Sequence, residues 1–168
     1  MNEDWTHDRD LDAWIAKHVM GLKSVGYYRR KSWNTSEWER CNKGDTSPAD
    51  AGENDPKVCA SLYYLNRSEN PNSACAVPCY SADMNHAYSM VNKMRSKGYL
   101  YNMTSLFRGT YTWVVVIQGT STPFNSFYSK CAHVTNKSLP YALCQATKIA
   151  REKSIHHSVA LENGTNNE

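Results

Sequence analysis

Apolar residues recur every third or fourth position in three stretches of this chain, and that spacing predicts three helices. The first helix is expected over DRDLDAWIAKHVMG at residues 8–21, where Asp8, Asp10 and Asp12 lie in or near the first turn. Its predicted buried face consists of Leu11, Trp14, Ile15, His18 and Val19. Gly21 follows the last periodic residue, so we expect it to end the helix in a left-handed conformation.

The second helix is predicted from Ser81, as the N-cap, to Lys97, with Gly98 ending it. Its expected buried face is Met84, Ala87, Tyr88, Val91 and Met94. The third helix is expected to begin after Ser138, with Pro140 in its first turn, where proline is tolerated. Its expected buried face is Leu139, Leu143, Ala146, Ile149 and Ala150.

Between the second and third helices the apolar period changes from about four to two. The segments YLYNMTSLF at 99–107, YTWVVVIQG at 111–119 and FYSKCAHV at 127–134 alternate or are continuously apolar, as strands do. Arg108 and Gly109 form the expected turn between the first two strands. We therefore predict an antiparallel three-stranded meander. Because a lone sheet of this size would leave Trp113 and its neighbours exposed, a homo-oligomer is also expected.

The region from about 24 to 78 shows no helical period and is rich in turn residues. Residues 32–38 and 58–65 are expected to form short strands within it. We interpret it as an expanded connection between two helices. The prediction is a single α+β domain over residues 1–160, with this insert at about 24–78 and a frayed tail at 161–168.

The composition is that of a globular protein and limits where the protein is expected to be found. It has 168 residues, of which 40% are hydrophobic and 21% charged, and no run is long and apolar enough to cross a bilayer. The acidic start MNEDWTHDRD is not that of a secretory signal, so a cytoplasmic location in a bacterial host is expected. A reducing cytoplasm favours free thiols over disulfides.

The net charge of +3 makes long nucleic acid an unlikely partner. The charge is unevenly spread, because residues 1–60 carry 9 basic and 11 acidic side chains, whereas residues 61–168 carry 10 basic and 5 acidic. This mildly cationic second part would suit a small anionic ligand.

Three segments in this order, DLDAWIAKHVMG, PCYSADMNHAYSMVNKM and LPYALCQATKIA, resemble the phage ABA sandwich domain family of small phage and prophage proteins. The residues that carry the resemblance are Val19, Met20 and Gly21; Tyr80, Ser81 and Asp83; and Pro140, Ala142, Leu143 and Cys144. By eye the resemblance covers roughly two-thirds of the chain and leaves out the insert at about 24–77. Some small phage proteins of similar size act as sponges that bind nucleotide-derived immune messengers. The resemblance therefore implies an anti-defence role, as an analogy of fold and context.

Catalytic motifs are missing from the sequence. It contains no H-E-x-x-H, G-x-S-x-G, Walker or Rossmann pattern. His133 with Cys131 or Cys144 is the one pair that could supply a nucleophile and a base, but buried cysteine is the simpler interpretation of these positions. We expect no enzymatic activity and no cofactor.

Four cysteines in or near the insert, Cys41, Cys59, Cys75 and Cys79, are a weak candidate for a zinc site. Their spacing is not that of two C-x2-C pairs, and loose thiols in a polar region are the simpler interpretation. The sequence therefore predicts no metal.

Ligand binding is the function that the sequence supports best. Arg29, Arg30 and Lys31 form a basic cluster that follows Tyr27 and Tyr28. Arg108 lies at the predicted hairpin tip, where its guanidinium could hold a phosphate in a bidentate manner. Eleven Tyr and five Trp offer rings on which a base could stack, Tyr101 among them.

The leading hypothesis is a non-enzymatic protein that sequesters a small phosphorylated, nucleotide-like host immune signal, of the cyclic nucleotide or cyclic ADP-ribose type. Two alternatives remain open at this point: a hydrolase of the same messenger, and a protein–protein inhibitor of a host defence enzyme.

Overall fold

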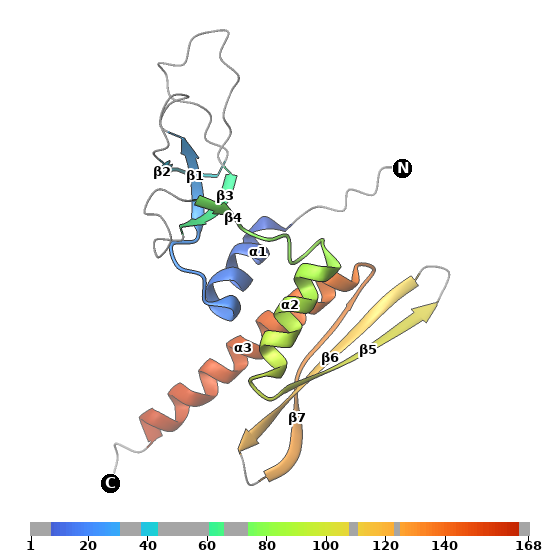
Figure 1. Cartoon of the computed structure of the whole chain (residues 1–168). Coiled ribbons are helices and arrows are strands. Elements are labelled where there is room, and N and C mark those ends of the chain that lie inside the picture. The colour runs from blue at the N-terminus through green and yellow to red at the C-terminus, as the bar shows by residue number, and fades with distance from the viewer. Residues whose placement is uncertain are drawn as a thin grey trace. The chain divides into compact units, whose positions relative to one another are not determined.

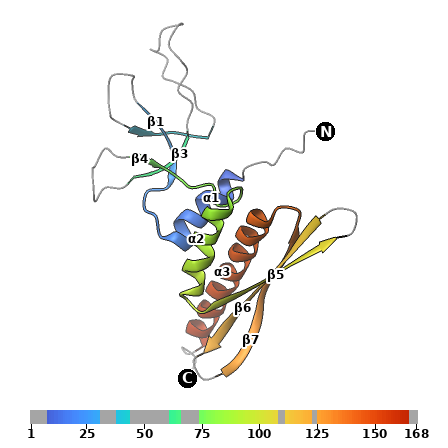
Figure 2. The ribbon, with the colours of Figure 1, turned by 45° about the vertical axis from the view of Figure 1, so that its right-hand side comes forward.

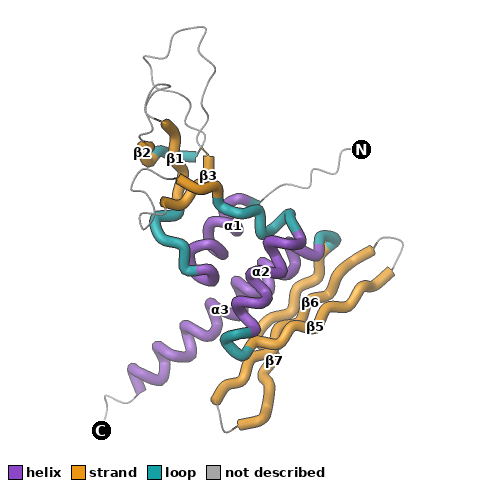
Figure 3. The backbone as a smooth tube through the Cα atoms, viewed as in Figure 1, coloured by secondary structure: helices purple, strands orange, loops and turns teal. Residues whose placement is uncertain are grey.

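The computed structural model describes residues 8–30, 38–43, 61–65, 74–107, 111–122 and 125–164. In the first half of the chain these form α1 (Arg9–Ile15), the π-helix η1 (Ala16–Met20), β1 (Gly26–Arg30), β2 (Trp38–Arg40), β3 (Ser61–Leu65) and β4 (Ala74–Ala76). In the second half they form α2 (Met84–Arg95), β5 (Tyr99–Phe107), β6 (Tyr111–Thr122), β7 (Asn125–Asn136) and α3 (Leu139–Gly164). The described chain is an α+β fold with three α-helices and two antiparallel sheets, so the predicted fold class is confirmed (Figures 1 and 3).

The chain divides into two compact units, where the sequence predicted one domain with an insert. Unit 1 joins Met1–Ile15 to Cys79–Glu168, and unit 2 is Ala16–Pro78. The end of the predicted insert, at about 78, coincides with the end of unit 2, but unit 2 starts earlier than the predicted 24. The described strands of the insert pair with one another in a sheet of their own, which is why the chain divides in this way.

Asp8 caps the first helix, because its side-chain Oδ1 accepts a hydrogen bond from the Leu11 amide at 2.9 Å. Leu11, Ile15 and Val19 are buried, as the apolar spacing predicted, whereas His18 is exposed and the prediction for it was wrong. The helical turns widen at residue 16 into η1, and with this change of period His18 lies off the buried stripe while Val19 stays on it. Gly21 has φ = 76°, which confirms the left-handed end.

The second helix begins two residues later than predicted. Asp83 is the N-cap, and its carboxylate accepts a hydrogen bond from the His86 amide at 3.0 Å. Ser81, the predicted cap, is buried and bound elsewhere. The buried residues are Ala87, Met90, Val91 and Met94, so the predicted burial of Ala87, Val91 and Met94 is confirmed, while Met84 is only partly buried. Tyr88 is 42% exposed, so its predicted burial was wrong. Gly98 ends the segment with φ = 87°.

Strands β5, β6 and β7 form the predicted meander, in that order, with Met103 opposite Val115 and Val115 opposite Val134. The helices of unit 1 all lie on one side of this sheet (Figures 1 and 2). Val115, Ile117, Ala132 and Val134 are buried under them, and alternate residues such as Val116 and His133 face the opposite side. Unit 1 is therefore a two-layer arrangement of helices on a sheet.

The third helix begins after Ser138, whose Oγ accepts from the Tyr141 amide at 3.4 Å. Its buried residues are Ala142, Leu143, Cys144, Ala146, Thr147 and Ala150. Leu139 and Ile149, which were predicted to be buried, are only partly so. The helix continues to Gly164, so residues 161–164 belong to it and not to the predicted frayed tail. Residues 165–168 lie outside the described chain.

Unit 2 holds a four-stranded antiparallel sheet in the order β2-β1-β3-β4. In register, Tyr28 lies opposite Arg40 and also opposite Ser61, while Tyr64 lies opposite Cys75. The predicted strand at 58–65 corresponds to β3, and the predicted strand at 32–38 overlaps the described chain only at Trp38, where β2 begins. β1 and β4 were not predicted, because neither shows an apolar alternation long enough to stand out from the turn-rich sequence around it.

Candidate functional site

Strand β1 carries the first group of predicted ligand residues: Tyr27, Tyr28, Arg29 and, by its backbone, Arg30. Lys31 and Arg108 lie outside the described residues, as does the side chain of Arg30. Tyr101 lies on β5 and belongs to unit 1, whereas β1 belongs to unit 2. The predicted set is therefore divided between the two units.

Two of the predicted stacking tyrosines are buried, and this corrects their assignment. Tyr28 is 6% exposed and its hydroxyl donates to the Ser24 carbonyl at 2.9 Å. Tyr101 is 7% exposed, and its hydroxyl lies 2.8 Å from Thr147 Oγ1. A ring that is this closely packed has no free face on which a base could stack. Both tyrosines therefore belong to the core and do not contact a ligand.

Arg29 is already neutralised within the sheet. It lies opposite Glu39 on β2, and its Nε donates to Glu39 Oε1 in an ion pair. A phosphate at this position would compete with that carboxylate for the guanidinium and would meet its negative charge. Arg29 is therefore a weaker candidate for binding a phosphate than the sequence indicated.

The other face of the same sheet collects a different group of side chains. Trp38 and Arg40 are two residues apart on β2, so both point to the face that Tyr28 also shares. Tyr63 on β3 reaches this face too, since it lies opposite Gly26. The Trp38 and Tyr63 ring centroids are 4.8 Å apart with an angle of 52° between the planes. We call Trp38, Arg40 and Tyr63 the aromatic–arginine face.

Gly26 allows the Arg40 guanidinium to lie close to the backbone of β1. A Cβ placed on Gly26 would come within 3.2 Å of Arg40 Nε and 3.6 Å of its Cζ. A larger residue at Gly26 would require the Arg40 side chain to shift by a few tenths of an ångström. The Arg40 guanidinium therefore lies against the residue that pairs with Tyr63 across the sheet.

The chemistry of the aromatic–arginine face differs from that around Arg29. Arg40 is exposed, Trp38 and Tyr63 are partly exposed, and within the described residues no carboxylate forms an ion pair with Arg40. Partly exposed rings can stack on a base, and a planar guanidinium can bind a phosphate through two parallel hydrogen bonds. The W-E-R alternation at 38–40 was a signal that could have identified the first two residues, but their pairing with Tyr63 depends on sheet register.

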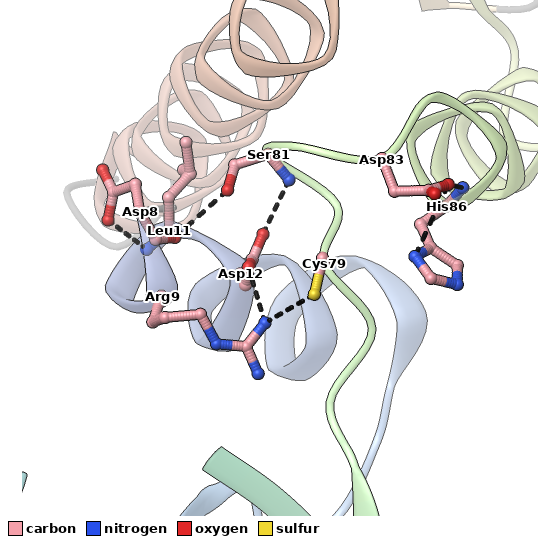
Figure 4. A network of polar contacts seen from close by, with 8 residues as sticks. All are labelled: Asp8, Arg9, Leu11, Asp12, Cys79, Ser81, Asp83 and His86. Carbon is pink, nitrogen blue, oxygen red and sulfur yellow. Dashed lines mark hydrogen bonds and ion pairs between the residues drawn. The ribbon is translucent and has the colours of Figure 1, made fainter. Parts of the chain in front are cut away.

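A network of polar side chains joins α1 to the start of α2 within unit 1 (Figure 4). The Asp12 carboxylate is fully buried; it accepts from the Ser81 amide at 2.7 Å and from Arg9 Nη1 at 2.9 Å. Arg9 Nη1 also lies 3.3 Å from Cys79 Sγ, and Ser81 Oγ lies 3.4 Å from the Asp8 carbonyl. Each acceptor in this network holds a backbone amide or a cation in place, so the network ties two segments together.

This network has no nucleophile paired with a base. The histidine drawn with it, His86, approaches Asp83 at 3.6 Å, and no dashed line joins it to Cys79 (Figure 4). The hydrogen bond from the His86 amide, followed by smaller contributions that include the charge of His86, lowers the pKa of Asp83. Asp83 therefore stays ionised as a helix cap and is poorly suited to donate protons.

His133 and Cys144, the candidate catalytic pair, do not meet. His133 is exposed on the side of β7 that faces away from the helices, and Cys144 is fully buried on α3. Burial, reinforced by the charges of Asp12 and Asp8, raises the pKa of the Cys144 thiol well above its usual range. The Cys144 thiol is therefore protonated and unreactive at neutral pH. The side chain of Cys131 lies outside the described residues.

The four cysteines of the weak zinc candidate are not gathered in the described part of the chain. Cys41 and Cys75 belong to unit 2, Cys79 belongs to unit 1, and Cys59 lies outside the described residues. Among the described side chains, no three His, Cys, Asp or Glu residues lie close enough together to hold a metal ion.

Comparison of the chain with protein-family models, with curated proteins and with solved structures gives no match. None of the described helices combines the length and the hydrophobicity that crossing a membrane requires.

Proposed function

We propose that this chain is a non-enzymatic phage protein of the ABA sandwich type that sequesters a small nucleotide-derived immune signal in the host cytoplasm. The aromatic–arginine face is the proposed binding surface. The observation that carries the proposal is the position of Arg40: it lies on the same face of the sheet as the Trp38–Tyr63 ring pair, its guanidinium lies against Gly26, and it has no carboxylate partner among the described residues.

The three side chains supply the two interactions that a nucleotide needs. A base stacks on an aromatic ring, and each such stack contributes about 1–3 kcal/mol. A phosphate accepts two parallel hydrogen bonds from one guanidinium, which favours arginine over lysine at this position. Compared with the ligand residues predicted from the sequence, the proposed site still includes β1, which lies between β2 and β3. Arg40 replaces Arg29 as the residue that contacts the phosphate.

The test is a calorimetric titration of the full-length protein with a panel of cyclic nucleotides and ADP-ribose derivatives. We expect one of them to bind and to raise the melting temperature, because a ligand that binds only the folded state stabilises it. Substitution Arg40→Gln should weaken that binding by about tenfold or more, since it removes a charge-assisted pair of hydrogen bonds.

Arg29→Gln is the matched control, because it removes the same charge from the neighbouring strand but from the opposite face, where Glu39 already neutralises it. We expect it to change the affinity by less than about threefold. If Arg29→Gln weakened binding and Arg40→Gln did not, the site would lie on the other face. If no member of the panel bound, sequestration would be excluded for this ligand class.

The same protein and ligands distinguish the two alternative functions, a hydrolase of the messenger and an inhibitor of a host enzyme. A hydrolase would return a chemically altered messenger after heat denaturation of the protein, whereas a sequestering protein returns it unchanged. An inhibitor that docks on a host enzyme would block signalling without any shift in melting temperature on addition of the messengers.

We also propose that two copies pair through the face of β5–β7 that is turned away from the helices, here called the outer face. Its described side chains are Leu100, Asn102, Thr104, Leu106, Thr112, Val114, Val116, Gln118, His133 and Thr135. None of these is Lys, Arg, Asp or Glu, whereas residues 79–168 as a whole contain nine basic and four acidic side chains. The register also places Lys130 opposite Gln118, so two cationic units can approach through this face with few like charges brought together.

A further inference from the structure

Strand β5 is an edge strand of the unit 1 sheet, since β6 is the only described strand that pairs with it (Figures 1 and 2). The edge of a sheet presents main-chain N–H and C=O groups to which another strand can bind, and proteins usually protect it with lysine, proline or a β-bulge. β5 contains no charged residue and no proline, and its register with β6 continues from Tyr99 to Phe107 without a shift. β5 therefore has none of these protective features.

The other edge strand of the same sheet, β7, is protected. It carries Lys130, and its pairing with β6 is interrupted by two register shifts. Exposed apolar side chains gather on the unprotected edge. Of the four large hydrophobic side chains that are exposed in the described part of the chain, three lie on β5, namely Leu100, Leu106 and Phe107. A contact along β5 would remove this apolar surface from water.

The residues of β5 match one another about the centre of the strand, Met103. In the sequence YLYNMTSLF an aromatic residue stands at each end, a leucine lies next to each of them, and a polar residue lies on either side of the methionine. A two-fold axis at Met103 would place two antiparallel copies of this strand in register with each other. The residues that would then lie opposite each other across the junction are Leu100 and Leu106, Tyr101 and Ser105, and Asn102 and Thr104.

We propose that two copies of the chain join through the edges of β5, in antiparallel register about Met103, so that their meanders form one continuous sheet. A second copy is the partner that the pattern favours, because Leu100 of each copy then covers Leu106 of the other in two symmetric pairs. The junction brings no like charges together, since β5 has no charged residue. The contact lies wholly in unit 1 and involves no ligand.

This edge contact is separate from the pairing through the outer face. Stacking of two outer faces forms no main-chain hydrogen bonds, whereas edge pairing forms them and leaves both outer faces on one side of the joined sheet. Leu100 and Leu106 contribute to both contacts. Met103 lies opposite Val115, on the side of the helices, and cannot meet its copy when the outer faces stack. A test at Met103 therefore reports on the edge contact alone.

The first experiment uses the full-length Met103→Cys protein under mild oxidation. In the proposed register residue 103 lies opposite its own copy, with the two Cα atoms about 4.5–5.5 Å apart, which is a separation that a disulfide spans. We expect most of the protein to become a covalent dimer, in which mass spectrometry identifies a peptide linked from residue 103 to residue 103. The native protein, which already contains six cysteines, gives the baseline.

Ser105→Cys is the matched control, because this exposed residue lies on the same strand and points to the same side as Met103. Its distance of two residues from the axis separates the two copies of residue 105 by about 14 Å along the strands, which is too far for a disulfide. We expect no 105–105 link above the baseline. Equal linking by both variants would indicate random collision and would overturn the proposed register, and the absence of a 103–103 link would overturn it as well.

The second experiment needs no substitution, so it tests the edge contact even if Met103→Cys does not fold. Amide hydrogen exchange of the native protein is measured by NMR at low and at high protein concentration. Between Leu100 and Leu106 every second amide points away from β6, and we expect these amides to exchange about tenfold more slowly at high concentration, because the second copy binds them. Unchanged exchange along β5, or equal slowing of the outward amides of β7, would contradict edge pairing.

Discussion

The donor in the hydrogen bond between the Tyr101 and Thr147 hydroxyls follows from the other contact that Thr147 makes. Either oxygen could donate across the 2.8 Å that separates them. Thr147 Oγ1, however, donates its single hydrogen to the Leu143 carbonyl at 2.7 Å, so Tyr101 must be the donor to Thr147. This arrangement joins β5 to α3 and requires a protonated tyrosine.

Tyr101→Phe should lower the free energy of unfolding by about 1 kcal/mol near pH 8, because it removes this buried hydrogen bond while keeping the ring. Burial raises the pKa of Tyr101 well above its usual value of 10.0. A raised pKa contributes stability that is present below pH 10 and is lost as the pH rises through the folded value. The difference in unfolding free energy between the native protein and Tyr101→Phe should therefore become smaller above about pH 10.

Urea denaturation of both proteins at a series of pH values measures this difference. Tyr88→Phe is the control, because its hydroxyl is on an exposed side chain. An unfolding free energy that differed between native protein and Tyr101→Phe by the same amount at pH 8 and pH 11 would contradict the assignment.

At the scale of elements, α1 and α2 are held together by Asp12, whose carboxylate the sequence indicated only as one of several acids in a first turn. Periodicity located the helices, the meander and both glycine ends. It misplaced the α2 cap, because Ser81 and Asp83 are both good caps and only the tertiary bond from the Ser81 amide to Asp12 decides between them. It also could not reveal Asp12 as a buried residue, since the amide that it binds lies 69 positions away.

Asp12→Ala should lower the free energy of unfolding by about 2 kcal/mol or more, because it leaves the buried Ser81 amide without an acceptor and Arg9 without its carboxylate. Asp10→Ala is the matched control on the same helix, where the side chain is exposed, and should change stability by less than about 0.5 kcal/mol. Chemical denaturation measures both. Equal effects would show that the acids act only through the helix end.

At the scale of the whole molecule, the helix–strand order was predictable but the division into units was not. The sequence showed where the insert ends, yet which strands pair within unit 2 depends on contacts between residues far apart in the chain. The candidate site also depends on contacts between residues that are far apart in the chain. Arg29 and Tyr28 stood out as neighbours in sequence, whereas Trp38 and Tyr63 meet only through the register of three strands.

Self-association through the outer face gives a prediction that belongs to this scale. Leu106→Glu places a charge on that face and should convert a dimer into a monomer in sedimentation experiments, because the new carboxylates would be desolvated at the contact. Tyr88→Glu is matched to it, since both native side chains are 42% exposed but Tyr88 lies on α2. A native protein that sediments as a monomer at every concentration, or a dimer that survives Leu106→Glu, would contradict the proposed pairing.

The composition of unit 1 from two distant stretches has a consequence for biosynthesis. Its first helix ends at Ile15, and the rest of its core begins only at Cys79. At a translation rate of about 5–20 residues per second, α1 is synthesised roughly 3 to 13 seconds before the rest of unit 1 begins to be made. During that interval the nascent chain carries an apolar helix without its partner, which is the kind of segment that holding chaperones bind.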